Sequence, residues 1–328
     1  SSSETCTPSG IAALHDNSDK TYAAEHAING MYYDNLEHLG YAVPESFGLK
    51  NFKNTADIEI NILRWWQHRI FRNSGVSADG TEIYLDTDWL TSLQSTAYSD
   101  RITWIENAYE FIDQPGEWYL NRSESKLYYK PDGSMDGKSA TLPVTEQLLV
   151  FEGTENITFD GVKFEDTSWL TPNEIGYNDA QSGTYAQHNG VWGDVPGAIE
   201  THAAKNITIT NSELRNLGIG GIRIGNGSSD CAITNSAIHD ISSSGIFIGN
   251  NTGHNHGYCD PGTDVTGVVV RNNYITRTGL DIFGSSAICA LYTSDTVIDH
   301  NEVCYTTYTG ISLGWGWDWK NAPCSGNN

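Results

Sequence analysis

Short runs in which apolar and polar residues alternate, rich in β-branched side chains, fill the chain from about Phe151 to its end. Asn and Gly interrupt these runs at recurring offsets, a pattern that predicts short strands and turns rather than helices. The run Asn156-Ile-Thr-Phe-Asp-Gly-Val-Lys-Phe returns in four later copies, which begin at Asn206, Cys231, Val269 and Val297. Aligned on a central Asn at positions 211, 235, 273 and 301, the later copies lie 24, 38 and 28 residues apart.

A second motif follows each later copy: Gly221-Ile-Arg-Ile-Gly, Gly245-Ile-Phe-Ile-Gly, Ala287-Ile-Cys-Ala-Leu and Gly310-Ile-Ser-Leu-Gly. Each repeat is therefore expected to hold three short strands separated by turns, with the turn Asn residues stacked as a hydrogen-bonded ladder. A unit of roughly 20–30 residues cannot bury its own apolar face and must stack on its neighbours. The Leu skeleton of a leucine-rich repeat and the even four-strand spacing of a propeller are missing. We predict an all-β, right-handed parallel β-helix, with a loop inserted at about Asn250–Asp264.

The front of the chain lacks this repeat and predicts an irregular α+β subregion that packs on the solenoid and covers its first edge. Residues 15–39 are compatible with a helix, residues 58–62 and 83–86 predict strands, and residues 106–112 predict a helix or turn. Gly116-Glu-Trp-Tyr-Leu and Lys126-Leu-Tyr-Tyr-Lys-Pro flank turn-like residues and predict a β-hairpin. We therefore divide the chain into this subregion, residues 1–110, and the hairpin plus coils, residues 111–328.

The chain is strongly acidic, with 41 acidic against 18 basic residues and a formal charge of −23. Such a field repels nucleic acid, anionic membrane surfaces and polyanionic glycans such as pectate, so the expected partner is neutral or cationic. No apolar run approaches about 18 residues, which argues against a membrane-spanning segment. Aromatic residues make up 11% of the chain, so some rings are expected at the surface.

Five Asn residues lie in N-glycosylation acceptor motifs: Asn121, Asn156, Asn206, Asn226 and Asn250. Together with six Cys and few Lys, they predict a secreted, extracellular protein in its mature form. The alternative is that such motifs arise by chance where Asn and Thr abound, and that Asn156 and Asn206 are turn residues. The six Cys, at positions 6, 231, 259, 289, 304 and 324, lack zinc-finger spacing and allow 15 pairings, which predicts structural disulfides.

The first candidate for a functional site is a long loop after a predicted strand, with two carboxylates, an amide and an aromatic ring. These residues are Trp169, Glu174, Asp179 and Gln181. Sugar recognition uses this mixture, because a ring face stacks on the apolar side of a sugar and the polar groups bind its hydroxyls. The alternative is an ordinary polar loop with one anchoring Trp.

The second candidate is Glu200-Thr-His202, where strand alternation places Glu200 and His202 on one face and Ile199 and Thr201 on the other. The pair predicts an acid/base or ligand-binding ridge, or else a solvated strand face.

The third candidate is the run Gly-Trp315-Gly-Trp317-Asp318-Trp319, whose Gly residues leave the indoles free of bulky neighbours. It predicts a stacking platform for sugars, although two of the three Trp residues could instead lie in a core.

Two further groups of residues carry weaker signals. Asp281 lies in a predicted turn before a strand and is a candidate carboxylate. His254, His256 and Asp260 of the inserted loop are better explained as a polar loop than as a metal site. No cofactor is predicted, and a structural calcium ion is left open.

Several of these segments resemble one known group of proteins. The run Asp113-Gln-Pro-Gly-Glu-Trp-Tyr-Leu-Asn-Arg, the first repeat at Asn156 and Thr309-Gly-Ile-Ser-Leu-Gly-Trp-Gly-Trp are similar to the right-handed parallel β-helix glycoside hydrolases of the pectin-lyase-like fold. The likeness includes the lacto-N-biosidase-like and β-helix fucosidase/xylanase-like groups. In this resemblance Trp169, Asp179 and Gln181 match the family's loop, and Asp281 falls where the family often has an acidic residue.

The resemblance implies a glycoside hydrolase that acts on a neutral or amino-sugar glycan with two carboxylates, drawn from Asp179, Glu200 and Asp281. Trp169, Glu174, Gln181, His202, Trp315, Trp317 and Asp318 would bind the substrate. A non-catalytic glycan-binding β-helix is the main alternative. A polysaccharide lyase is a third, and the shortage of Lys and Arg argues against it.

The resemblance also implies further coils, with a catalytic carboxylate, after the Gly-Trp-Gly-Trp strand. We therefore expect either lost activity or a partner: a second chain from the same precursor, or a homo-oligomer. Such a partner would cover the coil that carries Ile311 and Leu313. The alternative is a short cap formed by Lys320–Asn328, with Cys324 tied to Cys304.

Overall fold

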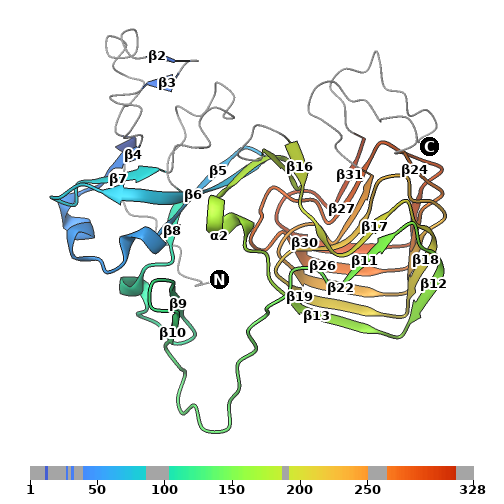
Figure 1. Ribbon diagram of the computed structural model, residues 1–328, viewed down its shortest axis with the longest axis horizontal. Coiled ribbons are helices and arrows are strands. Elements are labelled where there is room, and N and C mark those ends of the chain that lie inside the picture. Colours follow the sequence, from blue (N-terminus) through green and yellow to red (C-terminus); the bar gives the residue numbers. More distant parts are fainter. Residues whose placement is uncertain are drawn as a thin grey trace. The chain divides into compact units, whose positions relative to one another are not determined.

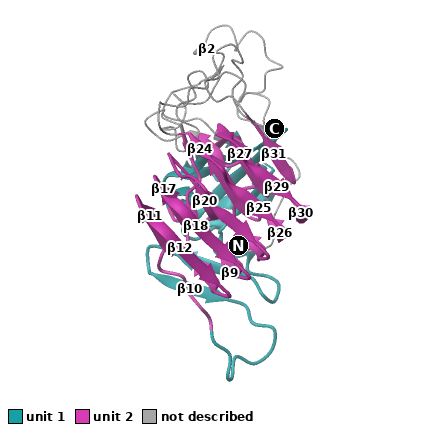
Figure 2. Ribbon diagram, turned by 90° about the vertical axis from the view of Figure 1, so that its right-hand side faces the viewer, with its two compact units in different colours: residues 1–139, 171–178, 187–190 teal, residues 140–170, 179–186, 191–328 magenta. Residues whose placement is uncertain are grey.

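The computed structural model describes residues 12–13, 27–28, 31–32, 40–85, 103–186, 192–249 and 264–314 (Figure 1). The chain forms two compact units (Figure 2). Unit 1 holds residues 1–139, 171–178 and 187–190, and unit 2 holds residues 140–170, 179–186 and 191–328. The segment between residues 170 and 191 therefore contributes to both units.

Unit 2 is a parallel β-helix built from three parallel sheets. The first sheet contains, in order, β11 (Leu149–Glu152), β17 (Gly197–His202), β20 (Gly220–Ile224), β23 (Ile246–Gly249), β27 (Ile288–Leu291) and β31 (Ile311–Leu313). The second contains β12 (Glu155–Asp160), β18 (Lys205–Thr210), β21 (Ala232–Thr234), β25 (Val269–Arg271) and β29 (Val297–Asp299). The third contains β13 (Lys163–Thr167), β19 (Glu213–Leu217), β22 (Ala237–Ile241), β26 (Tyr274–Thr278) and β30 (Glu302–Thr306). The predicted repeat of three strands per coil is confirmed.

The core of unit 2 consists of columns of apolar side chains that face inward from the three sheets. In the first sheet Ile199, Ile222 and Ile246 are register partners in successive coils, and all three are buried. Equivalent columns run through the other two sheets: Ile209, Ile233 and Val270, and Leu214, Ile238 and Ile275. Burial of each such side chain contributes about 1.5–3 kcal/mol. Because every column needs the neighbouring coil, stacking rather than any single coil supplies the stability.

The turn after the second sheet requires a left-handed backbone in each of the last four coils. Asn211, Asn235, Asn272 and His300 adopt it, with φ of 50°, 51°, 56° and 54°. Asn tolerates this conformation better than most residues, which explains why it recurs here. The alignment made on the sequence was therefore wrong by one residue in the last two copies, where positions 272 and 300 stand at the turn.

The adjacent positions form a separate hydrogen-bonded ladder. The backbone N–H groups of Ser212, Ser236 and Asn273 donate to a side-chain oxygen of the next coil, at 3.1, 3.0 and 3.0 Å. The acceptors are Ser236, Asn273 and Asn301. The predicted Asn ladder is confirmed between Asn273 and Asn301, whereas Ser212 and Ser236 take the equivalent positions in the two earlier coils.

An insertion in the first coil replaces the loop predicted there. It contains helix α2 (Thr171–Ile175) and strands β14 (Tyr177–Gln181), β15 (Thr184–Ala186) and β16 (Trp192–Asp194), of which β15 and β16 pair antiparallel. The next strand of the β-helix after β13 is β17, so this insertion separates the third strand of the first coil from the second coil. The loop predicted at 250–264 lies almost entirely outside the described residues.

Unit 1 is built mainly from antiparallel strands. Its strands are β1 (Ala12–Ala13), β2 (Ala27–Ile28), β3 (Met31–Tyr32), β4 (Gly40–Ala42), β5 (Glu59–Arg64), β6 (Gln67–Val76), β7 (Glu82–Leu85), β8 (Trp104–Glu106), β9 (Trp118–Asn121) and β10 (Lys126–Tyr129). Single 3₁₀ turns lie at η1 (Glu45–Phe47), η2 (Leu49–Asn51), η3 (Thr55–Asp57) and η6 (Tyr109–Phe111). The predicted strands near 60 and 84 and the predicted hairpin are confirmed. In the segment 15–39, where a helix was possible, the described residues are the two strands β2 and β3.

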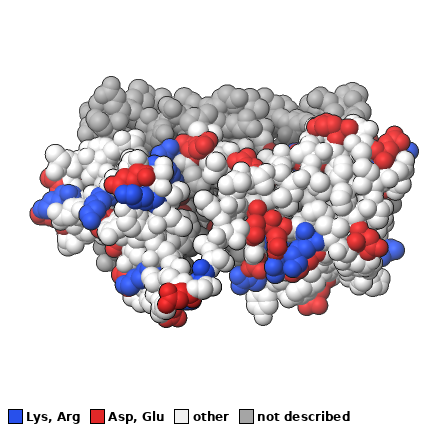
Figure 3. All heavy atoms as spheres, turned by 60° about the horizontal axis from the view of Figure 1, so that its bottom comes forward, with Lys and Arg blue, Asp and Glu red and all other residues white. Residues whose placement is uncertain are grey.

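Paired charges cover the outer face of the third sheet. Arg215 on β19 binds Glu165 on β13 at 2.8 Å, and Lys163 lies 3.7 Å from Glu213. Figure 3 shows acidic and basic side chains side by side on one face of the molecule. Exposed pairs of this kind contribute less than about 1 kcal/mol each, so they maintain solubility and cross-strand order more than stability.

Replacing Asn273 with alanine should destabilise the protein by about 1–3 kcal/mol, because buried polar groups of two neighbouring coils lose their partners. The Asn273 side chain accepts from Ser236 N at 3.0 Å and donates to Ile233 O and Asn301 Oδ1, both at 2.9 Å. Urea unfolding measures the change. Val297→Ala, at an exposed position of β29, is the control and should change stability by less than about 0.5 kcal/mol. Equal stabilities of the two variants would contradict the role of the ladder.

Candidate functional site

The outer face of β17 carries the polar pair that strand alternation predicted. Ile199 and Thr201 face inward and are fully buried. Glu200 and His202 project together from the other face, with His202 Nε2 3.1 Å from Glu200 Oε1. The predicted juxtaposition of Glu200 and His202 is confirmed.

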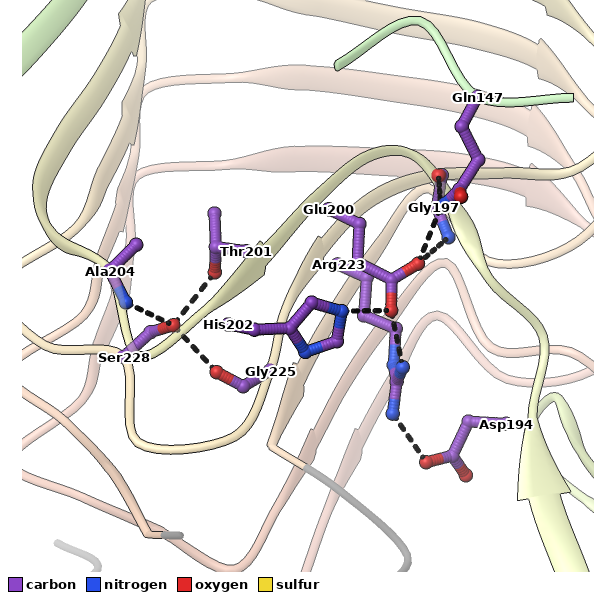
Figure 4. A network of polar contacts seen from close by, with 10 residues as sticks. All are labelled: Gln147, Asp194, Gly197, Glu200, Thr201, His202, Ala204, Arg223, Gly225 and Ser228. Atoms are coloured by element: carbon purple, nitrogen blue, oxygen red, sulfur yellow. Dashed lines mark hydrogen bonds and ion pairs between the residues drawn. The ribbon is translucent and has the colours of Figure 1, made fainter. Parts of the chain in front are cut away.

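A single arginine joins this pair to a second carboxylate. Arg223 is the register partner of Glu200 on β20. Its Nη1 donates to Glu200 Oε1 at 2.6 Å and its Nη2 donates to Asp194 Oδ2 at 2.9 Å (Figure 4). The side chains of Arg223, Glu200 and Asp194 are only 12%, 6% and 3% exposed. A buried guanidinium thus holds two carboxylates, one on each terminal nitrogen.

The second oxygen of Glu200 is held from the opposite side. Gln147 Nε2 donates to Glu200 Oε2 at 2.8 Å, and the backbone N–H of Gly197 donates to the same oxygen at 3.2 Å. Gln147 Nε2 also lies 3.1 Å from the carbonyl oxygen of Gly197. Both oxygens of Glu200 therefore accept hydrogen bonds, an environment suited to a carboxylate with a fixed orientation.

Local backbone features keep β17 and β20 in this arrangement. A Cβ at Gly197 would lie 2.7 Å from the backbone nitrogen of Arg223, so only glycine allows the two strands to approach here. Beyond the strands, Ser228 Oγ contacts Thr201 Oγ1 at 2.9 Å and donates to Gly225 O at 2.6 Å (Figure 4). These contacts fix the turns that follow Glu200 and Arg223 in the chain.

The inserted segment of unit 2 covers part of this face. Thr184 Oγ1 donates to Asp194 Oδ1 at 2.9 Å, which fixes Asp194 within the β15–β16 pair. The backbone N–H of Ser182 donates to Gly284 O at 2.9 Å, and Ser182 Oγ lies 3.1 Å from Ser286 Oγ. His202, whose side chain is 26% exposed, is the most accessible of the four charged or titratable side chains Asp194, Glu200, His202 and Arg223.

Further along the same outer column the side chains become apolar. Phe247 is the register partner of Arg223, and Cys289 is the partner of Phe247. The guanidinium carbon of Arg223 lies 5.8 Å from the centroid of the Phe247 ring. Both Phe247 and Cys289 are buried, and burial raises the pKa of the Cys289 thiol far above its usual range. In this column the charged side chains are therefore confined to β17 and β20, and Ser312 on β31 follows Cys289.

The structure gives the residues of the predicted sugar-binding loop different surroundings. Trp169 is 7% exposed and packs edge-on against Tyr185 at 5.6 Å, so it is a buried anchor rather than an exposed stacking platform. Gln181 Nε2 donates to Tyr308 OH at 3.1 Å, and Asp179 is buried. Glu174 is exposed on α2 and belongs to unit 1, whereas the other three belong to unit 2.

Asp281 lies in the exposed turn between β26 and β27. Its carboxylate accepts a hydrogen bond from Ser242 Oγ, and its backbone N–H donates to Ser242 O at 3.1 Å. These contacts tie two successive turns together. The other predicted residues, Trp315, Trp317 and Asp318 as well as His254, His256 and Asp260, lie outside the described residues.

The acceptor motifs differ in accessibility. Asn121 is 3% exposed, and its Oδ1 accepts from Ser123 Oγ and Glu124 N at 2.8 and 3.0 Å, which closes the β9–β10 turn and argues against a glycan there. Asn156 and Asn206 are exposed, adopt left-handed conformations and form a 2.8 Å hydrogen bond, as the turn-residue alternative requires. Asn226 is exposed. Asn250 lies outside the described residues.

The cysteines do not follow the disulfide prediction. Cys231, Cys289 and Cys304 are free thiols, and the first two are buried. For these three residues the prediction of structural disulfides is wrong, including the tie between Cys304 and Cys324. Cys6, Cys259 and Cys324 lie outside the described residues.

Two features of the described part of the chain concern ions and membranes. Within it, no group of three or more His, Cys, Asp or Glu side chains is arranged to hold a metal ion. Among the described helices, none is long and apolar enough to cross a bilayer.

Gln147, Asp194, Glu200, His202 and Arg223 form one polar cluster. Three of its residues were not predicted from the sequence: Gln147, Asp194 and Arg223. The repeat contained a signal for Arg223, since superposing Ile199 on Ile222 places Glu200 opposite Arg223. No such signal existed for Asp194, because the insertion that carries it has no counterpart in the later coils.

The chain is similar to known proteins in sequence and in fold. The family described as "Right handed beta helix region" matches residues 197–316. The fold is a right-handed parallel β-helix. A solved structure titled "Glycoside hydrolase" is similar to this chain with a TM-score of 0.73 and 23% sequence identity, over 88% of this chain and 56% of that one. The chain therefore spans little more than half of that protein. No curated protein matches.

Arg223→Met should destabilise the protein by about 3–5 kcal/mol, because two buried carboxylates would lose their shared partner. The midpoint of urea unfolding measures the change. Arg271→Met is the matched control: Arg271 also binds a carboxylate, Asp299, at 2.7 Å, but its side chain is 54% exposed, so its loss should cost less than about 1 kcal/mol. Equal losses of stability in the two variants would contradict a larger contribution from the buried ion pairs of Arg223 than from an exposed pair.

Proposed function

We propose that this chain is a secreted glycoside hydrolase that acts on a neutral or amino-sugar glycan. The observation that carries the proposal is the pair of carboxylates, Glu200 and Asp194, held on one guanidinium at the outer face of the β-helix. The fold shared with a protein titled "Glycoside hydrolase" supports it. The formal charge of −23 favours a substrate without negative charge.

The geometry suits the chemistry of glycoside hydrolysis. Glycosidases place two carboxyl groups about 5–5.5 Å apart when they retain configuration and about 6.5–9.5 Å apart when they invert it. Arg223 binds the two carboxylates on its two terminal nitrogens, so it fixes the separation between them. Their spacing then decides whether a carboxylate or a water molecule attacks the anomeric carbon as the glycosidic C–O bond breaks.

We assign the roles from the contacts. Glu200, with donors around both oxygens, is suited to act as the charged carboxylate that stabilises the oxocarbenium-like transition state. Asp194 is the second carboxylate, and His202 and Gln147 supply hydrogen bonds to sugar hydroxyls. Asp194 would then protonate the leaving oxygen as the glycosidic bond breaks. Asp179 and Asp281 stay predictions as catalytic carboxylates, and the contact of Asp281 with Ser242 favours a structural role for it.

One observation favours a second candidate, a non-catalytic glycan-binding protein. Both carboxylates are almost completely buried and both bind the same arginine. Buried ion pairs of this type also serve structure alone, in which case sugar would bind at the accessible His202 edge without being cleaved.

The test is hydrolysis of a panel of neutral aryl glycosides and oligosaccharides by the native protein. Glu200→Gln and Asp194→Asn should each lower kcat by on the order of 100-fold to 10,000-fold, because the carboxylate charge is lost while the shape is kept. Glu165→Gln, a surface carboxylate paired with Arg215, is the control and should leave the rate unchanged. Binding of an oligosaccharide without product release would favour the second candidate.

We propose secretion and N-glycosylation together. The exposed position of Asn226 supports an acceptor role for it, whereas the hydrogen bond between Asn156 and Asn206 favours turn roles for those two residues. A mass shift of the native protein on treatment with an amidase that removes N-glycans tests the idea, and an unchanged mass would contradict it.

We further propose that a second chain adds a coil to β31. Ile311 and Leu313 continue the inward columns of Ile288 and Ala290. They are nevertheless 43% and 68% exposed, whereas Ile288 and Ala290 are 0% and 3% exposed. Among the described strands β31 is the edge of its sheet, and an exposed apolar column on an edge strand favours association with another strand.

Leu313→Asp should therefore weaken association of the native protein by at least about tenfold, since a charge would enter the covered column. Sedimentation equilibrium of the native assembly measures the mass. Val144→Asp, at another exposed apolar position, is the control and should leave the mass unchanged. A fully active species of 36.0 kDa in the unmodified protein would contradict the proposal.

A further inference from the structure

Unit 1 contains a pocket that the proposed catalytic chemistry does not use. Its volume is about 280 Å³, and it is lined by Lys53, Asn54, Tyr109, Asn121, Glu124 and Tyr128. All six residues belong to unit 1. Ligand pockets in proteins usually measure about 300–1,000 Å³, so this one has room for a single ring rather than a longer segment.

Three tyrosines give the pocket a rigid aromatic wall. Tyr109 stands nearly perpendicular to Tyr119 and Tyr128, with ring centroids 6.0 and 5.3 Å away. Tyr119 stacks on Tyr128 at 6.1 Å. Such offset and edge-on arrangements are the favourable ones for aromatic pairs. The lining rings Tyr109 and Tyr128 are therefore held in place before any ligand arrives.

Hydrogen bonds of Tyr119 and Asn121 also fix the position of this aromatic wall. The hydroxyl of buried Tyr119 donates to Asp57 Oδ2 at 2.5 Å. Burial and this carboxylate raise the pKa of Tyr119, so the phenol stays neutral and keeps donating. Asn121, which also lines the pocket, is held by the hairpin turn through its Oδ1. A pocket built this way loses little entropy on binding.

The charged groups at the pocket are arranged for hydroxyls rather than for a net charge. Lys53 Nζ lies 4.4 Å from the centroid of the Tyr109 ring, and among the described residues its ammonium has no carboxylate partner. Glu124 forms an exposed ion pair with Lys126 at 2.9 Å, and the hydrogen bond from Lys126 lowers the pKa of Glu124, so its carboxylate stays charged. An ammonium donor and a carboxylate acceptor therefore both border the space beside Tyr128.

We propose that this pocket binds one pyranose ring of a neutral glycan, apart from the proposed catalytic cluster. The apolar face of the sugar would stack on Tyr128, with Lys53 donating to a hydroxyl and Glu124 accepting from another. The opposite charges of Lys53 and Glu124 disfavour a sugar acid and an amino sugar with a free amine alike. The glycan class rests on the proposed function, whereas the pocket and its single-ring size do not.

Saturation-transfer NMR on the intact chain tests the proposal. The probes are the methyl glycosides of galactose, glucose, xylose and N-acetylglucosamine, with methyl glucuronide as the acidic comparison. At least one neutral glycoside should receive saturation. Tyr128→Ala and Lys53→Met should each weaken its binding by about tenfold, because a stacking face or a charged donor is lost.

Tyr129→Ala is the matched control, since Tyr129 is the next residue on β10, is 46% exposed and does not line the pocket. It should bind like the unmodified protein. Lys53 is a surface residue, so its variant keeps the test valid if Tyr128→Ala fails to fold. No saturation of any neutral glycoside, equal binding by Lys53→Met, or saturation of the glucuronide alone would overturn the proposal.

The Glu200→Gln variant separates this proposal from the proposed function. It should keep the neutral glycoside bound at Tyr128 while losing hydrolysis. If the native protein hydrolysed no glycoside but Tyr128→Ala still lost sugar binding, the enzyme proposal would fail and the pocket would stand. If hydrolysis proceeded but binding were insensitive to Tyr128 and Lys53, the pocket proposal alone would fail.

Discussion

The register between successive coils determines where every other feature of unit 2 lies. Parallel strand pairing places each residue directly above its counterpart, so an inward isoleucine in one coil stands on an inward isoleucine in the next. The same pairing places Glu200 beside Arg223 on the outer face. A shift of one residue in either strand would exchange the faces, burying the charges and exposing the aliphatic column. The left-handed turn residues prevent such a shift, because every coil must turn at the same position.

The charged cluster can lie buried beside this core because its charged groups bind one another. An unpaired charge at 12% exposure or less would be costly, and three such groups occur within one small region. One cation between two carboxylates, with an amide and a backbone N–H on the far oxygen of Glu200, removes most of that cost. The arrangement also fixes the direction of each carboxylate, as the proposed glycoside hydrolysis would require. Stability and positioning thus depend on the same contacts.

The solenoid could be predicted from the sequence because every coil needs apolar residues at the same positions in order to stack on its neighbours. Alternation alone placed Glu200 and His202 on one face, and this held because β17 is a regular strand. The exact alignment failed at Asn272 and Asn273, since two adjacent Asn residues both suit the turn and the backbone register distinguishes them. Asp194 could not be found, because it comes from an insertion without a repeat partner. The buried state of Trp169 depends on Tyr185, a contact between segments that no local pattern encodes.

The reactivity of the Cys289 thiol would report how often the outer face of the first sheet opens. The thiol lies in the same outer column as Arg223, has no solvent exposure, and forms no disulfide. A thiol reagent can reach it only when the neighbouring segments separate, so the rate of alkylation counts opening events at one position of the solenoid. Cys231 is a buried thiol directly before β21 of the second sheet, and its alkylation would count openings there. The chain thus carries two internal probes, whose relative rates would tell whether its coils open one side at a time or unfold together.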